Sequence, residues 1–316
     1  MSRHSSVTII LVVMAVIIGF IPRLLPSYYV SLLTQVLIFS LFALSLDLVL
    51  GYTGLPSLGH AAFFGVAGYF AGILNAKVLD SFWVALASGL AASVLCASIF
   101  GLLVLRTKGP YFLMITLALG QMLWGVAFKW RSLTGGDDGL PGIPRPNFGI
   151  LHWDLNGTIN YYYFVLVCFL IAFLLLYLVA HSPFTHVLKG IRENEKRMTT
   201  LGFNVWLYKY LAFILSGLFG GLAGILHVYY NNFVSPADLS VVMSTEVFLM
   251  VLVGGPGTLL GPILGAAVIV LLSNFISIYT ERWVLILGLI YVATILYAPK
   301  GIYVPIKHSF YKWLRL

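Results

Sequence analysis

The segment Gly51–Tyr69, GYTGLPSLGHAAFFGVAGY, interrupts a series of apolar runs with glycines, a proline, two hydroxyl side chains and a histidine. The interruption falls at a depth where a bilayer is expected to hold plain helix. A backbone break exposed to lipid leaves N–H and C=O groups without partners, at several kcal/mol each. This segment is therefore expected to be buried in protein or to line a wet path, which indicates transport.

The composition excludes an ordinary soluble domain. Hydrophobic residues make up 60% of the chain and charged residues 9%, whereas about 25% of residues are charged in soluble domains. Apolar runs of the roughly 20 residues that cross the hydrocarbon cover most of the sequence, and they predict an all-α polytopic membrane protein. About ten spans are expected: Val7–Leu25, Val30–Leu50, His60–Leu79, Phe82–Leu105, Tyr111–Phe128, Tyr161–His181, Tyr210–Tyr230, Val241–Val253, Leu259–Tyr279 and Trp283–Ala298.

The net charge of +8 does not indicate nucleic-acid binding, because the positive residues gather in three clusters beside apolar runs. They lie in the loop 182–209, in the tail after residue 299, and at Arg106 and Lys108. The positive-inside rule places all three clusters in the cytoplasm. Both termini are then expected inside and the loop 129–160 outside. No linker divides the chain, so residues 1–316 are expected to form one membrane domain.

A second break echoes the first. Leu249–Val268, LMVLVGGPGTLLGPILGAAV, repeats the order of events in Leu48–Val66: an apolar run, a Gly/Pro/Thr break, a Leu-Gly step and a helix of small residues. Paired Gly/Pro interruptions in two halves are typical of a transporter path in a repeated fold. Alternatively, Gly and Pro are simply frequent in membrane helices. The candidate gate residues are Gly51, Gly54, Pro56, Gly59, Gly254, Gly255, Pro256 and Gly257.

Five polar residues near the breaks are candidates for the solute path: Asp47, Thr53, Ser57, His60 and Glu246. Asp47 and Glu246 precede the two breaks and are expected in similar places in the two halves. Ionisable groups within spans are costly and usually functional. These carboxylates either shape the path or stabilise the breaks by accepting backbone N–H bonds. Alternatively, the Asp47 side chain reaches the membrane–water interface and Glu246 pairs with a group on another helix. A structural role is favoured for both residues.

Pro56 and Ser57 are expected to start a new helix, with Ser57 as its N-cap. The free N–H groups of such a helix end would suit an anionic group such as a carboxylate. Helix capping without any ligand is an equal alternative.

Two hydrophilic loops are candidates for contacts with other proteins. In the outer loop, LTGGDDGLPGIPRP has the composition of tight turns. Gly135, Gly136, Asp137 and Asp138 are the candidate docking surface there, with plain solvated turns as the alternative. The Asp-Asp pair is too short for a calcium loop.

The inner loop is expected to hold one short charged helix over Leu188–Leu201, ended by Gly202. Four apolar residues are spaced for one edge of it: Leu188, Ile191, Met198 and Leu201. A charged helix that projects from a membrane domain offers a grip to a soluble partner. The alternative is a basic loop set against anionic lipid.

The chain carries no G-x-S-x-G, H-E-x-x-H, C-x-x-C or G-x-x-x-x-G-K-[ST] motif. We therefore expect neither an enzyme nor a metal or cofactor site, and the chain is not expected to hydrolyse ATP through a phosphate-binding loop. A stand-alone secondary transporter is one alternative, which the charged inner helix disfavours. A membrane-embedded enzyme is another, but only Asp47 and Glu246 are deep enough to serve it.

Six motifs in order, from Leu41 to about Ile302, resemble the M-type permease subunits of branched-chain amino-acid ABC importers. They are GLPSLGHAAFFGVAGY, LRTKGPYFLMITLALGQM, TGGDDGLPGIP, GIRENEKRMTTLGFN, KYLAFILSGLFGGLAGILH and VLVGGPGTLLGPILGA. The resemblance implies a fold like that of type II ABC importers, in the cytoplasmic (inner) membrane of a bacterial-type cell. It also implies a second homologous permease, two ATPase subunits that bind the ATP, and an extracytoplasmic substrate-binding protein.

By the same resemblance, Lys189–Gly202 is the coupling helix seated in a cleft of the ATPase. Its family positions in this chain are Lys189, Arg192, Glu193, Glu195 and Gly202. The stretch Lys196–Thr200, KRMTT, departs from the family's smaller residues, which leaves the ATPase contacts open. Branched-chain or related amino acids are the expected solutes, with urea, short amides or other small organic solutes as alternatives.

Overall fold

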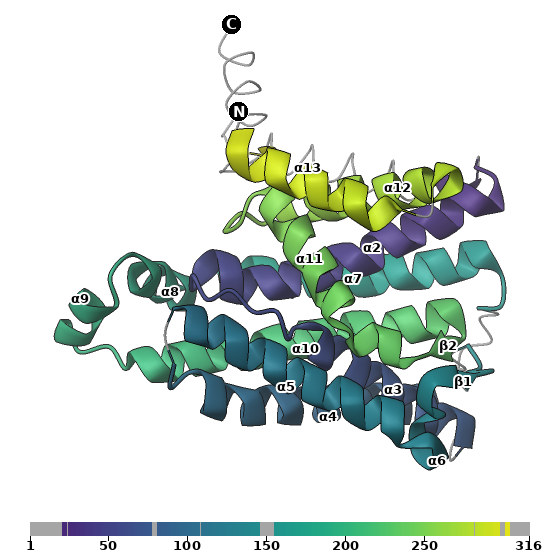
Figure 1. The fold of residues 1–316 in the computed structure, drawn as a ribbon, viewed down its shortest axis with the longest axis horizontal. Coiled ribbons are helices and arrows are strands. Elements are labelled where there is room, and N and C mark those ends of the chain that lie inside the picture. Colours follow the sequence, from purple (N-terminus) through teal and green to yellow (C-terminus); the bar gives the residue numbers. More distant parts are fainter. Residues whose placement is uncertain are drawn as a thin grey trace, which may run out of the picture.

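The computed structural model describes residues 21–23, 25–77, 81–107, 109–145, 155–280, 282–297 and 301–303, and most of them are helical (Figure 1). The elements are η1 (Ile21–Arg23), α2 (Ser27–Asp47), η2 (Leu48–Tyr52), α3 (Ala61–Lys77), α4 (Phe82–Val104), α5 (Pro110–Lys129), α6 (Arg131–Thr134), η3 (Gly136–Asp138), β1 (Leu140–Pro141), α7 (Thr158–Ala180), α8 (Pro183–Glu193), α9 (Glu195–Thr200), α10 (Val205–Asn231), β2 (Phe233–Val234), η4 (Pro236–Leu239), α11 (Val241–Gly254), α12 (Gly261–Tyr279) and α13 (Trp283–Tyr297).

The helices confirm an all-α membrane protein. Among the described residues, six helices are long and apolar enough to cross a membrane: α2 with η2, α4, α5, α7, α10 and α12. The apolar helices α3 and α11 are shorter, because each adjoins a break. Together with α13, these helices lie over nine of the ten predicted spans. The first predicted span lies almost wholly outside the described residues, and the count of about ten stays a prediction.

The core of the bundle is built around α2 and α10, which are the two most deeply buried of the long helices. Small residues let these helices approach their neighbours closely. A Cβ on Gly224 of α10 would lie only 2.0 Å from the carbonyl oxygen of Phe64 in α3. Hydrogen bonds between helices add to this packing, as where Ser93 Oγ donates to Gly217 O at 2.7 Å.

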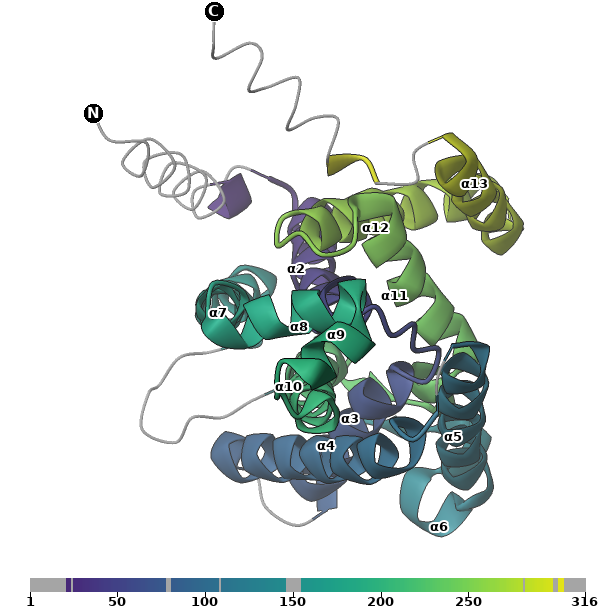
Figure 2. The ribbon, with the colours of Figure 1, turned by 90° about the vertical axis from the view of Figure 1, so that its left-hand side faces the viewer.

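The helix α11 connects two parts of the molecule. It runs from the neighbourhood of α5 to α12, across the direction of the longer helices, as both views of the ribbon show (Figures 1 and 2). On the far side of it, α12 packs against α2 and α11, and α13 packs against α11 and α12. This oblique course brings the break at the end of α11 beside the break at the end of α2.

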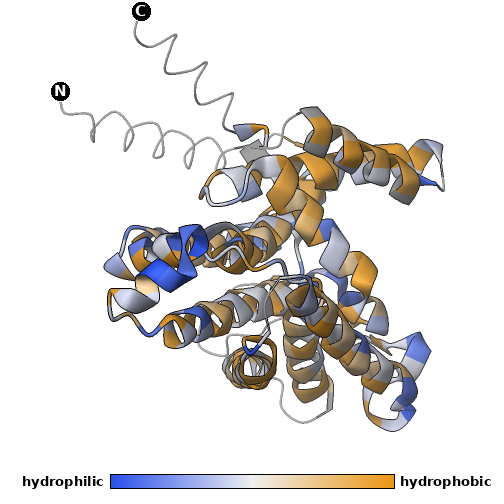
Figure 3. Ribbon diagram, turned by 60° about the vertical axis from the view of Figure 1, so that its left-hand side comes forward, coloured by the Kyte–Doolittle hydropathy of each residue, from blue (hydrophilic) through white to orange (hydrophobic). Residues whose placement is uncertain are grey.

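The two hydrophilic loops lie at opposite ends of the bundle. The helices α8 and α9 project at one end, and hydrophilic residues gather on them, whereas the long helices are mostly apolar (Figure 3). At the other end β1 pairs antiparallel with β2, next to α6 and η3. In this predicted outer loop Gly135, Gly136, Gly139 and Gly142 all have positive φ, which is the turn geometry expected from their sequence.

The predicted single helix over Leu188–Leu201 is wrong: the structure has two helices, α8 and α9, separated at Asn194. Asn194 has extended backbone angles, and its side chain accepts a hydrogen bond from Arg197 N at 3.0 Å. It therefore caps α9, a role for which asparagine is well suited. Leu188 and Ile191 are buried as expected, but Leu201 is 63% exposed, so the apolar edge does not extend that far.

The predicted stop at Gly202 is confirmed. Gly202 has a φ of +87°. Its N–H donates to Thr199 O at 3.0 Å, and the N–H of Phe203 donates to Met198 O at 3.2 Å. These two bonds form a Schellman motif, which satisfies the last carbonyls of α9 and which glycine favours at this position.

The prediction that a helix starts at Pro56 with Ser57 as N-cap is wrong. Residues 53–60 are not helical, and α3 begins at Ala61. Its first N–H group is satisfied from another helix, since Ser244 Oγ of α11 accepts from Ala61 N at 3.0 Å. The group that caps α3 lies 183 residues away in the sequence and leaves no signal near Ala61. For this reason the Pro56-Ser57 pair predicts the wrong starting residue for the helix.

Candidate functional site: the junction of the two breaks

The two helix breaks predicted from the sequence lie directly against each other. Asp47, the last residue of α2, is buried, and its Oδ1 accepts a hydrogen bond from Gly257 N at 2.8 Å. A Cβ on Gly51 would lie 2.2 Å from the same Gly257 nitrogen, so only glycine permits this approach. We call this contact the junction, formed by Asp47, Gly51 and Gly257.

The first break satisfies its backbone groups partly by its own hydrogen bonds and partly by bonds to other elements. After α2 the chain continues as η2, a single π-helical turn, which is a form often found at functional sites. Leu55 N then donates to Val49 O at 3.0 Å, and Thr53 Oγ1 donates to the same oxygen at 2.5 Å. Gly54, with a φ of +74°, redirects the chain toward α3. The break is thus a built structure within the protein interior.

The second break is held by its threonine. Gly255 and Gly257 have positive φ values of 116° and 80°. Thr258 Oγ1 donates to Gly255 O at 2.8 Å and accepts from Gly261 N at 3.1 Å. The hydroxyl therefore bridges the end of α11 to the start of α12. This Gly/Pro/Thr pattern corresponds to the first break in order, but its internal bonds are different.

Arg192 of α8 reaches both breaks. Its Nη1 donates a hydrogen bond to the carbonyl oxygen of Gly51. A Cβ on Gly54 would lie 3.0 Å from Arg192 Cγ, and one on Gly257 would lie 3.1 Å from Arg192 Nη1. Lys189, one turn earlier, places its ammonium 5.4 Å from the centre of the Tyr52 ring, a cation–π contact. The predicted coupling segment is therefore in direct contact with the junction.

Three predicted path residues are buried near the junction: Thr53, Ser57 and His60. The His60 ring stacks on Phe42 with ring centres 5.4 Å apart, and its Nε2 lies 2.8 Å from Ser45 Oγ. The Ser57 hydroxyl and His60 Nδ1 have no hydrogen-bond partner among the described residues. In this conformation these side chains belong to the packing beside the break.

The prediction that Asp47 and Glu246 occupy similar places is wrong. Asp47 lies at the junction, but Glu246 is the sixth residue of α11, eight residues before Gly254. At about 1.5 Å per residue, that places it about 12 Å along the helix from the break. There it lines a cavity of about 480 Å³ together with Asp137. Within the described part of the chain, Glu246 forms no ion pair with another helix.

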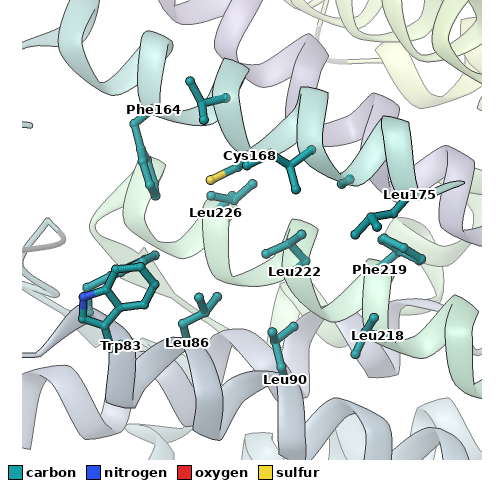
Figure 4. Close-up of a pocket in the computed structure, with 14 residues that line it drawn as sticks. Trp83, Leu86, Leu90, Phe164, Cys168, Leu175, Leu218, Phe219, Leu222 and Leu226 are labelled. Carbon is teal, nitrogen blue, oxygen red and sulfur yellow. The ribbon is translucent and has the colours of Figure 1, made fainter. Parts of the chain in front are cut away.

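A larger cavity of about 660 Å³ lies between α4, α7 and α10 (Figure 4). Its labelled side chains are apolar apart from the indole of Trp83 and the thiol of Cys168. A site for a polar solute needs a few placed polar groups, and this wall offers almost none. The cavity is therefore no candidate for the solute path.

Apolar membrane helices, two interrupted helices that meet in the interior, and a basic helix in contact with their meeting point define a membrane transport protein. The comparison with known families agrees. The chain belongs to the family described as branched-chain amino acid transport system / permease component, whose sequence profile matches residues 28–295.

Individual relatives cover most of the chain. It is 28% identical over 297 residues to the high-affinity branched-chain amino acid transport system permease protein LivM of Escherichia coli K12, covering 86% of this chain and 69% of that protein. The probable LivM permease of Methanocaldococcus jannaschii is 23% identical, covering 77% and 79%. The LivH permease of E. coli K12 is 21% identical, covering 84% and 90%. No solved structure matches the chain.

Proposed function

We propose that this chain is the M-type permease subunit of an ATP-driven importer for branched-chain or related amino acids. The observation that carries the proposal beyond family membership is the contact of Arg192 with the junction. It gives a soluble partner that grips α8 and α9 a direct mechanical link to the helix breaks. A stand-alone secondary transporter has no use for such a link.

The proposed partners follow from the relatives. Two differently named permeases, LivM and LivH, both resemble this chain, which supports a second homologous permease beside it. Two ATPase subunits would bind the ATP, and this chain would hold no cofactor. The end with α8 and α9 and both termini would face the cytoplasm, and the loop with Asp137 and Asp138 would receive an extracytoplasmic binding protein.

The mechanism is alternating access at the junction. In the state described here, Asp47 joins the two breaks and Arg192 holds the Gly51 carbonyl. When the ATPases bind ATP and close, α8 would shift and move the Arg192 side chain. This movement would change the free-energy difference between a closed and an open junction. The two helix breaks can be arranged as a closed or an open junction, and the position of α8 determines which of the two is favoured.

Reconstituted vesicles test this function. The chain is co-expressed with the second permease and the ATPases, placed in proteoliposomes, and supplied with the binding protein and radiolabelled leucine. Uptake is expected only with ATP on the ATPase side. Uptake by vesicles that lack the ATPases, driven by an ion gradient, would contradict the proposal. Uptake of urea or short amides in place of leucine would support the alternative solute class.

Gly202→Pro is expected to uncouple ATP hydrolysis from uptake without preventing membrane insertion. Proline requires a φ near −65° and has no N–H, whereas Gly202 has a φ of +87° and donates to Thr199 O. The end of α9 should unravel at a cost of more than about 1 kcal/mol. We expect uptake per ATP hydrolysed to fall about tenfold or more, since about 1.4 kcal/mol corresponds to a factor of ten.

The matched control for this substitution is Gly202→Asn, because asparagine tolerates the left-handed conformation. It should keep the uptake-to-hydrolysis ratio close to the original value. If Gly202→Pro transports as efficiently as Gly202→Asn, the end of α9 has no part in coupling.

A further inference from the structure

The cavity beside Glu246 has two chemically different sides. It is an open cavity lined mostly by residues of α5, η3, η4 and α11 and has a volume of about 480 Å³, within the range of roughly 300–1,000 Å³ typical of small-molecule sites. Asp137 and Glu246, two acidic residues, are among those that line it. Trp124, Phe128 and Met243 provide an apolar wall.

Glu246 has no local explanation as a structural residue. It forms no ion pair or hydrogen bond with the described residues, and a half-buried carboxylate without a partner is costly. The first turn of α11 is already capped by Ser240, whose Oγ accepts from Met243 N at 3.2 Å. The favourable effect of a helix N-terminus falls off within its first turn, and Glu246 lies in the second.

The apolar wall suits a group that carries both hydrocarbon and positive charge. The rings of Trp124 and Phe128 are stacked, with centres 5.0 Å apart and planes at 20°. Such ring faces bind hydrocarbon and also attract cations. A ligand with an ammonium group next to an aliphatic side chain would fill both sides of the cavity.

We propose that this cavity binds the ammonium group and side chain of an α-amino acid on its way to the junction. The ammonium group lies between the carboxylates of Glu246 and Asp137, and the side chain lies against Trp124, Phe128 and Met243. The inference rests on the proposed function and narrows its solute. Urea and short amides carry no positive charge, so they leave Glu246 unpaired and bind weakly here.

The position of the cavity supports this role. Asp137 belongs to the loop proposed to receive the binding protein, and α11, which carries Glu246, ends at the second break. A solute released at the loop therefore meets this cavity before it reaches the junction.

Protection of an introduced cysteine tests the site. In the complete importer, the two free cysteines are removed by Cys96→Ala and Cys168→Ala, and Val242→Cys is introduced, because Val242 lines the cavity and is 53% exposed. The rate of reaction with N-ethylmaleimide is measured with three probes: 3-methylbutylamine, 3-methylbutanamide and L-leucine. The amine and the amide have the same branched hydrocarbon and differ in charge.

The amine and L-leucine are expected to slow the labelling, and the amide is expected to need about tenfold higher concentration, the scale of one charge-assisted hydrogen bond. Adding Glu246→Gln should remove the preference for the amine. The control is Thr245→Val, next to Glu246 on α11, whose exposed hydroxyl bonds only within its own helix at 2.8 Å. It should leave the preference intact.

Equal protection by amine and amide, unchanged protection after Glu246→Gln, or no protection by any probe would each overturn the inference. ATP-driven leucine uptake is measured on the same vesicles. Normal uptake together with any of these results overturns the cavity assignment and leaves the proposed function standing. Absence of ATP-driven uptake in the unmodified importer counts against the proposed function itself.

Discussion

Gly51→Val is expected to abolish solute uptake, because a side chain at this position would drive the two helix breaks apart. A Cβ on Gly51 would lie 2.0 Å from Asp47 Oδ1 and 2.2 Å from Gly257 N, whereas non-bonded atoms prefer roughly 3.5 Å or more. The backbones must separate by more than 1 Å, roughly, to accept it. That movement breaks the 2.8 Å bond between Asp47 and Gly257. Uptake of leucine by the reconstituted importer is the measurement.

The control for this substitution is Gly288→Val in α13, where a Cβ meets nothing within 4 Å. It should transport normally, since valine is a better helix former than glycine. Thermal unfolding in detergent separates loss of fold from loss of gating: overpacking at Gly51 is expected to cost about 1–3 kcal/mol, which leaves an inserted protein. Normal uptake by Gly51→Val would show that the two breaks need not touch.

Arg192→Ala is expected to lower uptake per ATP hydrolysed by about 5–30-fold, corresponding to about 1–2 kcal/mol. The substitution removes a charged donor from the Gly51 carbonyl. Such bonds contribute about 1.5–3 kcal/mol, and the guanidinium is partly exposed, so the lower part of that range applies. ATP hydrolysis itself should continue, because the ATP-binding sites are proposed to lie on other subunits. Uptake and phosphate release are measured together.

Arg106→Ala is the matched control, because Arg106 is an exposed arginine just after α4, outside the helices α8 and α9 that the ATPases are proposed to grip. This substitution should change the uptake per ATP hydrolysed much less than Arg192→Ala does. Arg192→Lys should fall between the two, since lysine keeps the charge but not the planar guanidinium. Combining Arg192→Ala with Asp47→Asn gives a further check: two residues that hold one junction are non-additive, and strictly additive effects would mean that they act separately.

Much of the fold and part of the site could be predicted from local pattern. The breaks at Gly51 and Gly254, the stop at Gly202 and the two hydrophilic loops all depend on residues close together in the chain. The incorrect predictions have different causes. The start of α3 depends on Ser244, which is remote in sequence. Asn194 falls inside the predicted helix Leu188–Leu201, because the charged residues on both sides of it follow a helical pattern that hides its role as a cap.

The sequence by itself determined that this chain is a helical membrane protein with two interruptions, because burial in hydrocarbon and backbone hydrogen bonding act on each segment separately. Only the tertiary structure decided that the two interruptions touch, that Arg192 reaches across 141 residues to Gly51, and that Asp47 binds Gly257 across 210. It also separated Glu246 from Asp47. These contacts depend on how α8 and α11 pack against the bundle, and apolar periodicity carries no information about that packing.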